Sequence, residues 1–404
     1  MRVADQWALD PSIDFLNHGS FGACPRAVLA AQLEWRERME AEPVAFLARD
    51  LESQLDEARA AVGTFVGADP DDLAFVANAT SGIATILRSV RFAPGDELLT
   101  TDHEYNAALN ALRLAADRDG AVVTVVRLPF PLDDPVAVEA AILAAVSPRT
   151  RLAMVSHVTS PSALVLPVER IVPALAERGV DTLVDGAHAP GMVPLALDAL
   201  GAAYYVGDGH KWLFGPKGSA FLHVRRDRQA MIRPLAISHG ANAARTDRSR
   251  FRLEADWTGT GDPSASLSLP AAIRFGASLR PGGWATTMTD DRALALAGRD
   301  RLCAALGVAP PAPDGMLGSM AVIPLPGAAA PPDEDPLAAA LFERHRIEVP
   351  IIGLPVPAAL GPGERARFRL VRISAAPYNR LAQYERLAAA LVEELEREAG
   401  TGEL

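Results

Sequence analysis

The sequence predicts an α/β fold, in which helices cover both faces of a mostly parallel β-sheet and a smaller C-terminal α+β domain follows. The chain has 404 residues, more than one compact hydrophobic core usually holds, so two domains are expected. Short apolar runs alternate with helical patterns between residues 73 and 206, which is typical of a parallel sheet with crossover helices. The alternation ends near the Arg-Pro-Gly-Gly stretch of residues 280–283, where a different pattern begins.

The large domain is expected to begin with two helices and to continue as alternating strands and helices. Apolar residues recur at helical spacing in 26–41 and in 46–66. The expected strands are 73–76, 97–100, 121–127, 152–157, 182–185, 204–206 and 219–224, and the helices between them are 81–90, 106–117, 136–145 and 168–177. Ligands of such sheets bind beyond the carboxyl ends of the strands, so a functional site is expected there.

A smaller domain is expected over residues 283–404, after a large domain of residues 21–282 and an N-terminal segment, 1–20, that packs near the active site. Its expected elements are a helix at 289–306, a link through Pro310, Pro311 and Pro313, a strand at 320–323, a helix at 336–344, strands at 347–351 and 368–374, and a helix at 379–398. The stretch 324–335 is rich in Pro and Ala and predicts a surface loop.

Charge and cysteine content restrict the partners and the compartment. The formal net charge is -11, which disfavours binding to nucleic acid or to an anionic membrane. The two cysteines, Cys24 and Cys303, exclude a disulfide framework and fit a reducing compartment. The first residues lack the apolar core of a signal peptide, and no uncharged apolar run is long enough to span a bilayer. We therefore expect a cytoplasmic protein.

The segment 207–218, Gly-Asp-Gly-His-Lys-Trp-Leu-Phe-Gly-Pro-Lys-Gly, joins two strand-like runs. Its Lys211 lies between His210 and Trp212 and is flanked by glycines, which does not suit an ordinary solvated lysine. In a cleft, burial lowers the pKa of a lysine and frees its amine as a nucleophile. Lys211 is therefore expected to form a Schiff base with pyridoxal 5'-phosphate (PLP).

PLP also needs an acid that keeps its pyridine nitrogen protonated. Asp185 ends a predicted strand, where its carboxylate can reach into the crevice and pair with that nitrogen. His188 lies three residues further on and can contact the phenolic oxygen of the ring. The alternative is an aspartate that caps the next turn beside an ordinary buried histidine.

The phosphate of PLP needs hydroxyl and backbone N–H groups. Residues 78–82, Asn-Ala-Thr-Ser-Gly, follow a predicted strand and open a helix. Amides at a helix N-terminus bind anions, and Thr80 adds a hydroxyl. Plain N-capping by Asn78, Thr80 or Ser81 is the alternative, and it does not exclude phosphate binding.

Three further residues lie where a ring or a substrate would bind. Tyr105 follows the strand 97–100 and can stack on the cofactor ring, although a packed aromatic at a helix start is an equal alternative. The loop 157–162, with Ser160, follows another strand and offers hydroxyls to the ring. Arg372 lies in an apolar strand and needs an anionic partner, either a substrate carboxylate or a structural salt bridge.

The order of these motifs resembles the class V aminotransferase family, which includes cysteine desulfurases, over nearly the whole chain. The subgroup it resembles most is that of isopenicillin N epimerase and its relatives. The marks are Phe-Leu-Asn-His-Gly-Ser-Phe-Gly at 15–22, Glu42-Pro43 with Phe46 and Arg49, Ser-His-Val-Thr-Ser-Pro at 156–161, His210-Lys211-Trp212, and Trp-Thr-Gly-Thr-Gly-Asp-Pro at 257–263.

The resemblance implies fold type I of the PLP-dependent transferases and a role for each marked residue. Lys211 becomes the Schiff-base lysine, Asp185 the partner of the pyridine nitrogen and Tyr105 the ring-stacking residue. Cofactor contacts also fall to His188 and Ser160, and phosphate contacts to Ala79 (through its N–H), Thr80 and His210. Thr260 would reach the phosphate of a neighbouring subunit, because family members are homodimers with shared active sites. Arg372, Asn17 and His18 would bind the substrate, with its α-carboxylate on Arg372.

Two departures from the family pattern restrict the chemistry. Asp208 stands where relatives usually carry Ser, Thr or Asn, and it would repel the phosphate unless it turns away or pairs with His210. The region that holds the nucleophilic cysteine of many desulfurases is here residues 351–357, Ile-Ile-Gly-Leu-Pro-Val-Pro. Its lack of cysteine argues against a desulfurase that forms a persulfide.

Several functions remain open. The first is a PLP enzyme that acts at the α-carbon of an amino acid or aminoacyl substrate, as isopenicillin N epimerase does. A C–S lyase that eliminates the β-substituent of cysteine conjugates, or an aminotransferase, is the alternative. From a different class comes a non-catalytic PLP-fold binding module. A metal-dependent hydrolase using His157, Asp185 and His188 ranks last, because the sequence lacks a compact metal-ligand spacing.

Overall fold

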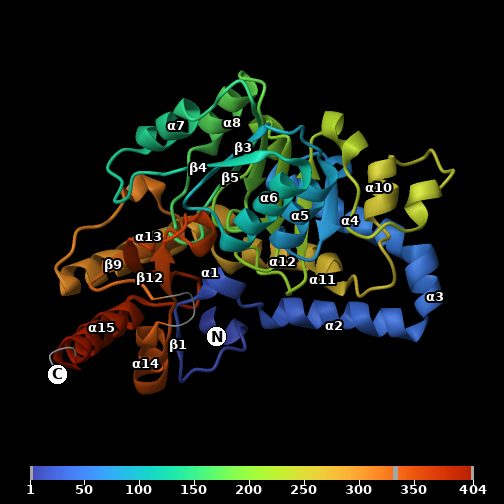
Figure 1. The fold of residues 1–404 in the computed structure, drawn as a ribbon. Coiled ribbons are helices and arrows are strands. Elements are labelled where there is room, and N and C mark those ends of the chain that lie inside the picture. The colour runs from blue at the N-terminus through green and yellow to red at the C-terminus, as the bar shows by residue number, and fades with distance from the viewer. Residues whose placement is uncertain (1–2, 331–334, 402–404) are drawn as a thin grey trace.

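The computed structural model describes residues 3–330 and 335–401, and its larger part is built on a seven-stranded sheet (Figure 1). The strands are β2 Leu73–Val76, β3 Glu97–Thr101, β4 Val122–Val126, β5 Thr150–Ser156, β6 Asp181–Asp185, β7 Tyr204–Asp208 and β8 Ala220–Val224. They lie in the order β2-β8-β7-β6-β5-β3-β4. Strands β3 to β7 are mutually parallel, and β8 is antiparallel to both of its neighbours. The predicted mostly parallel sheet is confirmed.

Helices cover both faces of this sheet because its central strands are apolar on both sides. On β5, Leu152 and Met154 belong to one hydrophobic core and Ala153 and Val155 to another, as the alternation of side chains along a strand requires. The first core contains residues of α5 Ala79–Ser89 and α6 Asn106–Asp119, and the second contains residues of α7 Pro135–Ala144 and α8 Val168–Ala176. The two cores fix the sheet in place from opposite sides.

The C-terminal part is the predicted smaller α+β domain. Its sheet has the order β11-β12-β9 and is antiparallel, with β9 Met320–Leu325, β11 Ile351–Leu354 and β12 Phe368–Ser374. Its helices are α13 Gly283–Leu306, α14 Pro336–His345 and α15 Leu381–Thr401, and α13 packs against both α15 and β9. A short parallel pair, β1 Asp14–Phe15 with β10 Ile347–Glu348, ties the N-terminal segment to this domain.

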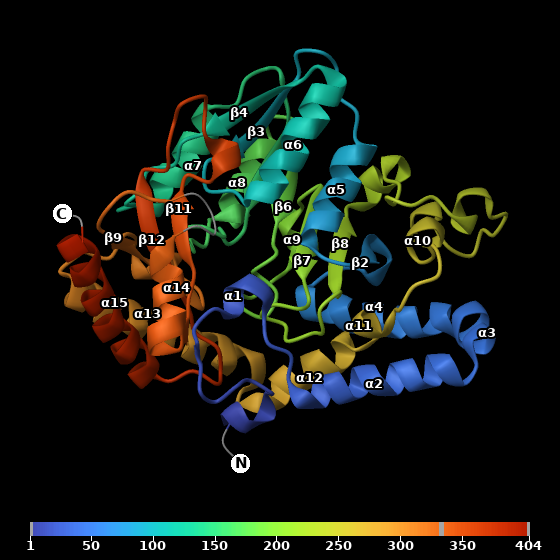
Figure 2. The same cartoon turned by 60° about the horizontal axis from the view of Figure 1, so that its bottom comes forward.

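The N-terminal helices extend away from the sheet as two arms (Figure 2). They are α2 Arg26–Ala41, α3 Pro43–Ala45, the π-helical turn η2 Phe46–Asp50 and α4 Leu51–Val66, and the helices α11 Ser264–Leu267 and α12 Leu269–Leu279 pack against both α2 and α4. The remaining short elements are η1 Val3–Gln6, α1 His18–Phe21, η3 Pro70–Asp72, α9 Leu197–Leu200, η4 Arg226–Met231, η5 His239–Asn242, α10 Arg250–Ala255, η6 Asp314–Met316 and η7 Pro357–Ala359.

The structure differs from the predicted elements in several places, among them the start of α13, which begins at Gly283 and not at residue 289. The helix expected over 46–66 opens with the wide turn η2, and α12 was not predicted. The strand expected over 347–351 divides at Pro350, which has no N–H, into β10 and β11 in different sheets. The loop expected over 324–335 begins later, since Pro324 and Leu325 belong to β9, and its residues 331–334 lie outside the described part. The domain boundary at 283 stays a prediction; α13 begins there, after a break at Gly282 with φ 90°.

Within residues 3–330 and 335–401, no helix combines the length and apolar character needed to cross a bilayer.

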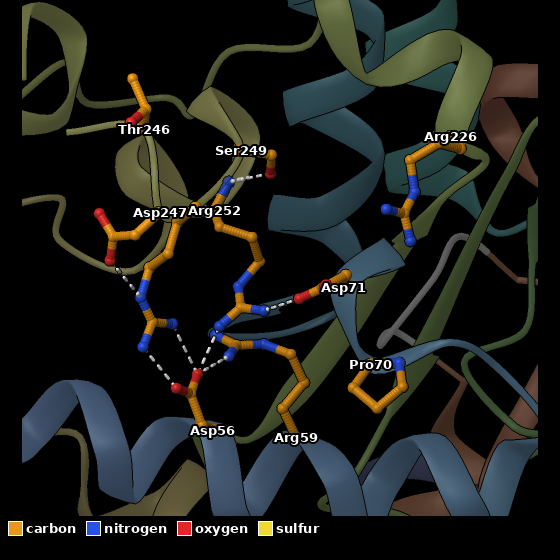
Figure 3. Close-up of a pocket in the computed structure, with 10 residues that line it drawn as sticks. Asp56, Arg59, Pro70, Asp71, Arg226, Thr246, Asp247, Ser249 and Arg252 are labelled. Atoms are coloured by element: carbon orange, nitrogen blue, oxygen red, sulfur yellow. Dashed lines mark hydrogen bonds and ion pairs between the residues drawn. The ribbon is translucent and has the colours of Figure 1, made fainter. Parts of the chain in front are cut away.

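A polar cavity of about 570 Å³ lies between α4, η3 and α10, away from the carboxyl ends of the strands (Figure 3). Asp56 at its centre accepts hydrogen bonds from Arg59, Arg248 and Arg252. Arg252 also pairs with Asp71. Since carboxylates balance these guanidinium groups, the cluster is an ion-pair junction that joins the three elements, not an anion-binding site.

Replacing Asp56 with asparagine is expected to destabilise this junction. Burial tends to raise the pKa of Asp56, but Arg248, Arg252 and Arg59 outweigh it and lower the pKa to about 2. The carboxylate therefore contributes stability above pH ~4, its ordinary range, and the contribution is lost as the pH falls through about 2. Because Asp56 is partly exposed, we expect a loss of roughly 2 kcal/mol at pH 7, below the figure for a fully buried pair. Urea unfolding of the wild type and variant at pH 7 measures it; equal midpoints would contradict the role.

Candidate active site

Several of the predicted site residues lie at one edge of the seven-stranded sheet. The parallel strands β6 and β7 end at Asp185 and Asp208, and β5 ends at Ser156, directly opposite Asp185. The carboxyl ends of adjacent parallel strands meet at one edge, which is where ligands of such sheets bind. The segment that carries Lys211 leaves β7 at this edge.

Lys211 is held beside an acid that the sequence marked only as a departure from the family pattern. Its Nζ lies 3.1 Å from Oδ2 of Asp208, and its side chain is 14% exposed. Oδ1 of Asp208 accepts the backbone N–H of Ala79 at 2.8 Å, and Nε2 of His210 lies 3.7 Å from Oδ2. Asp208 therefore faces the lysine and the start of α5 together. The sequence contains only two lysines, Lys211 and Lys217.

Helix α1 fixes the backbone of Lys211. Nε2 of His18 is 3.1 Å from the carbonyl oxygen of Lys211, and Nδ1 is 2.7 Å from the hydroxyl of Tyr378 in the smaller domain. Both ring nitrogens of this buried histidine are thus engaged by protein groups, and burial lowers its pKa to about 3. Gly22, with φ 68°, closes α1 so tightly that a Cβ there would lie 2.1 Å from the carbonyl oxygen of His210.

Asp185 and His188 are both buried near Lys211. One oxygen of Asp185 accepts the N–H of Ala187 at 3.0 Å. Burial raises the pKa of Asp185, although the Ala187 amide and the charge of Lys211 oppose the shift. Nδ1 of His188 accepts the indole N–H of Trp212 at 3.3 Å, and burial holds the pKa of His188 well below its ordinary value. The imidazole of His188 is therefore neutral at pH 7.

The start of α5 combines a cap with exposed polar groups. Oδ1 of Asn78 accepts the N–H of Ser81 at 2.8 Å, so the N-capping alternative is confirmed for Asn78. The amide of Ala79 donates to Asp208, and Thr80 is exposed. Helix α5 begins at Ala79, two residues before the predicted start.

Arg372 is a buried cation with neutral partners. Its side chain on β12 donates from Nη1 to the carbonyl oxygen of Ser160 at 2.7 Å and to Oγ of Ser160 at 3.2 Å, and from Nη2 to Oγ of Ser20 at 2.9 Å. Oγ of Ser20 donates in turn to Asn17. Arg372 is 4% exposed, its Nε has no hydrogen-bond partner among the described residues, and burial lowers its pKa to about 10. Among the described residues its hydrogen-bond partners are Ser160 and Ser20, and no carboxylate pairs with it, so the salt-bridge alternative is not met.

Tyr105 and Thr260 are both exposed to solvent. Tyr105 is 46% exposed at the start of α6, and its charge interaction with Arg372 places the two near each other. Thr260 is exposed in the loop after Trp257. The loop residues on either side of Thr260 line a cavity of about 350 Å³ together with Ser81 of α5.

Two residues near the site were not predicted. Ser20 links Arg372 to α1, and only its position within the Asn-His-Gly-Ser motif hinted at a role. Glu104 is buried, accepts the N–H and hydroxyl of Ser156 at 2.8 and 2.6 Å, and has a pKa that burial raises to about 8. Its position directly before Tyr105 was the only feature of the sequence that could have indicated a role for Glu104. In the described residues His157, Asp185 and His188 form no metal-ligand cluster, which leaves the hydrolase hypothesis without support.

Known proteins similar to this chain belong to the family that its motifs resemble. The profile of the family described as "Aminotransferase class-V" matches residues 20–298. The chain belongs to the class V aminotransferase family. It is 39% identical to the isopenicillin N epimerase of Amycolatopsis lactamdurans over 97% of this chain and 98% of that protein. It is 30% identical to the L-cysteine desulfhydrase of Arabidopsis thaliana over 94% of this chain and 87% of that protein. The predicted family and subgroup are confirmed.

Solved structures share the fold. The cysteine desulfurase CsdA of Escherichia coli superimposes with a TM-score of 0.78, at 21% identity over 97% of each chain. The cystine C–S lyase C-DES, in complex with cysteine persulfide, gives a TM-score of 0.75 at 21% identity over 94% of this chain and 97% of that chain. The predicted fold class is confirmed, and this member of the class V family is a PLP-dependent enzyme.

The residues present fit PLP. A lysine side chain, a buried carboxyl and a helix N-terminus converge at one sheet edge, and the buried Arg372 keeps an unpaired Nε. Besides burial, the charges of four nearby residues lower the pKa of His188: Lys211, Arg372, His210 and His18. These residues therefore lie close together around His188. This donor set provides an amine, an acid and anion-binding groups, which are the groups that PLP and an amino acid need.

Proposed function

We propose that this enzyme acts at the α-carbon of an amino acid or aminoacyl substrate, with Lys211 as its Schiff-base lysine, in the manner of isopenicillin N epimerase. The observation that carries the proposal is the buried Arg372, a guanidinium with neutral partners beside the Lys211 site. A buried cation is stable when an anion completes its hydrogen bonds, and an α-carboxylate has the planar geometry that a guanidinium binds best.

Lys211 is proposed to hold the cofactor covalently and, once released by substrate, to move the α-proton. Lys217 is the only other lysine, and its Nζ donates to the carbonyl oxygen of Gly22 at 2.7 Å. Asp208, whose carboxylate lies 3.1 Å from Nζ of Lys211, supports Lys211 for this role because a nearby carboxylate can orient the amine.

Other residues are proposed to orient the cofactor. PLP, when bound, withdraws electrons from the α-carbon and so makes its proton acidic. Asp185 would keep a proton on the ring nitrogen, with Tyr105, His188 and Ser160 at the ring. Thr80 and His210 would bind the phosphate; the amide of Ala79, also proposed for it, donates to Asp208.

For substrate binding, Ser20 and Asn17 would hold Arg372 toward the substrate carboxylate. His18 would act on the substrate only through the backbone of Lys211, since both of its ring nitrogens already contact protein groups.

Epimerisation is ranked above β-elimination, and the relatives support both. The chain is 39% identical to an isopenicillin N epimerase, while the desulfhydrase relatives and the C–S lyase fold favour release of a β-substituent. Transamination is a further alternative. Chemistry that needs a cysteine thiolate is disfavoured, because burial raises the pKa of both Cys24 and Cys303 and no cysteine lies in residues 351–357.

Incubation with amino acids in heavy water separates these reactions. We expect deuterium to enter the α-position of the preferred substrate without release of pyruvate or thiol, because reprotonation returns the α-carbon to an amino acid. S-substituted cysteines belong in the same panel, and mass spectrometry with a pyruvate assay measures both outcomes. Pyruvate formed in step with substrate loss would instead establish the lyase. Absence of exchange and product across the panel would favour the binding-module alternative.

We also propose a homodimer in which Thr260 reaches the phosphate of the partner site. Its exposed loop, next to the cavity at α5, supports this arrangement. Light scattering is expected to give about twice the chain mass of 42.7 kDa. A mass of one chain at micromolar concentration would contradict the shared site.

A further inference from the structure

The amino-terminal edge of the seven-stranded sheet carries a second cluster of ligating side chains. His223 lies on β8 and pairs with Tyr205 near the start of β7, whereas Ala220 pairs with Asp208 at the active-site edge. Asp72 of η3 and Asp198 of α9 lie against His223, and each of the three residues offers an atom within 4.8 Å of the others. The cluster is therefore separate from Lys211 and plays no part in the proposed reaction.

His223 points to a ligand. It is 2% exposed, and neither Nδ1 nor Nε2 has a hydrogen-bond partner among the described residues. A buried imidazole without hydrogen bonds is costly, and such groups in native proteins usually have an explanation. Nε2 faces Oδ1 of Asp198 at 3.5 Å, beyond a good hydrogen bond.

The separations suit a tetrahedral ion. Zn²⁺ bonds to nitrogen and oxygen at roughly 2.0–2.1 Å, which places neighbouring ligand atoms of a tetrahedron about 3.3 Å apart. The 3.5 Å between His223 and Asp198 is already close to that value. Asp198 has a side chain that is 54% exposed, so it can adjust, and solvent can supply a fourth ligand.

The other contacts of the two carboxylates leave room for a cation. Arg226 and Gln229 both donate to Oδ1 of Asp72, at 2.5 and 2.6 Å. The N–H of Asp69 donates to Oδ2 of Asp198 at 2.9 Å. These bonds orient both carboxylates, and each acid keeps a second oxygen. In the other cluster of this kind, His345 already contacts Glu394 at 2.8 Å, so its nitrogen is satisfied.

We propose that Asp72, Asp198 and His223 bind one divalent transition-metal ion of the Zn²⁺ or Co²⁺ type. One nitrogen and two carboxylate ligands favour such borderline ions over Mg²⁺, which prefers oxygen ligands alone. The ion joins η3, α9 and β8 at the edge opposite the active site. Its role is structural, so it raises thermal stability.

The test titrates the metal-free holoenzyme with Co²⁺ and with Zn²⁺. We expect one equivalent of Co²⁺ to produce the visible bands of four-coordinate cobalt, and Zn²⁺ to raise the melting temperature. Asp198→Asn, at an exposed position that should fold normally, is expected to weaken binding by at least about tenfold and to abolish the thermal shift. His223→Gln is expected to remove the cobalt bands.

His345→Gln is the matched control, because it alters the other cluster and should leave both signals intact. Unchanged affinity in Asp198→Asn would overturn the proposal even if His223→Gln fails to fold. Loss of the signals in His345→Gln, or no binding to the wild type at 100-fold excess metal, would overturn it as well.

Discussion

Replacing Lys211 with alanine is expected to reduce turnover by at least about 10⁴-fold and to remove the absorbance of the protein-bound cofactor. The variant loses both the covalent bond to PLP and the amine that moves the α-proton, and general acid–base catalysis alone contributes roughly 10² to 10⁴. Absorbance spectra and single-turnover assays measure the two losses. Because Asp208 would lose its cationic neighbour, the variant must also be checked for folding by circular dichroism.

The chain has only two lysines, so the lysine that binds the cofactor can be identified directly. Borohydride reduction of the wild type should fix the cofactor to one peptide, and the only lysine side chains available are Lys211 and Lys217. Lys217→Ala is the control: it removes a hydrogen bond to Gly22 and should retain the colour and most of the activity. Label on the Lys217 peptide, or an unchanged spectrum in Lys211→Ala, would refute the proposed role of Lys211.

The layered fold was predictable because its signals are local. Each central strand is a short apolar run with residues such as Leu152 and Ala153 facing opposite cores, and each helix between strands shows its own periodicity. The elements that escaped prediction lack such signals. Helix α12 begins with Leu269-Pro270. Proline is common in the first turn of a helix, but it is equally common in loops, so the sequence does not distinguish the two. The split of β10 from β11 depends on which sheet each half joins.

The residues of the candidate site could be proposed from the sequence, but the contacts between them could not. Strand ends and motif order brought out Asp185, Lys211 and Arg372. The hydrogen bond from Ala79 to Asp208 joins residues 129 positions apart, and that from Arg372 to Ser20 spans 352 positions. No local pattern encodes such contacts, because they form only when segments far apart in the sequence fold together. For this reason the sequence suggested that Asp208 would repel the phosphate, whereas in the structure its carboxylate faces Lys211.

Replacing Arg372 with glutamine is expected to lower kcat/KM by about 10² to 10³, mainly through a higher KM. Truncating one partner of a buried, hydrogen-bonded charge pair costs roughly 2–5 kcal/mol, and the substrate carboxylate would be the group left unpaired. Steady-state kinetics on the preferred substrate measures the split between KM and kcat. The protein itself should lose little stability, since the native Arg372 has only neutral partners.

Arg369 supplies the matched control on the same strand, three residues away. It is equally buried but pairs with Asp335 and Glu398, so its charge is already balanced within the protein. Arg369→Gln is therefore expected to reduce the free energy of unfolding by about 3 kcal/mol while KM stays within about twofold. The opposite pattern, with stability lost in Arg372→Gln and KM raised in Arg369→Gln, would make Arg372 structural. In the part of the chain that the structure describes, Arg372 has no acidic partner, whereas Arg369 has two. Comparing the two variants therefore distinguishes an effect on substrate binding from an effect on stability.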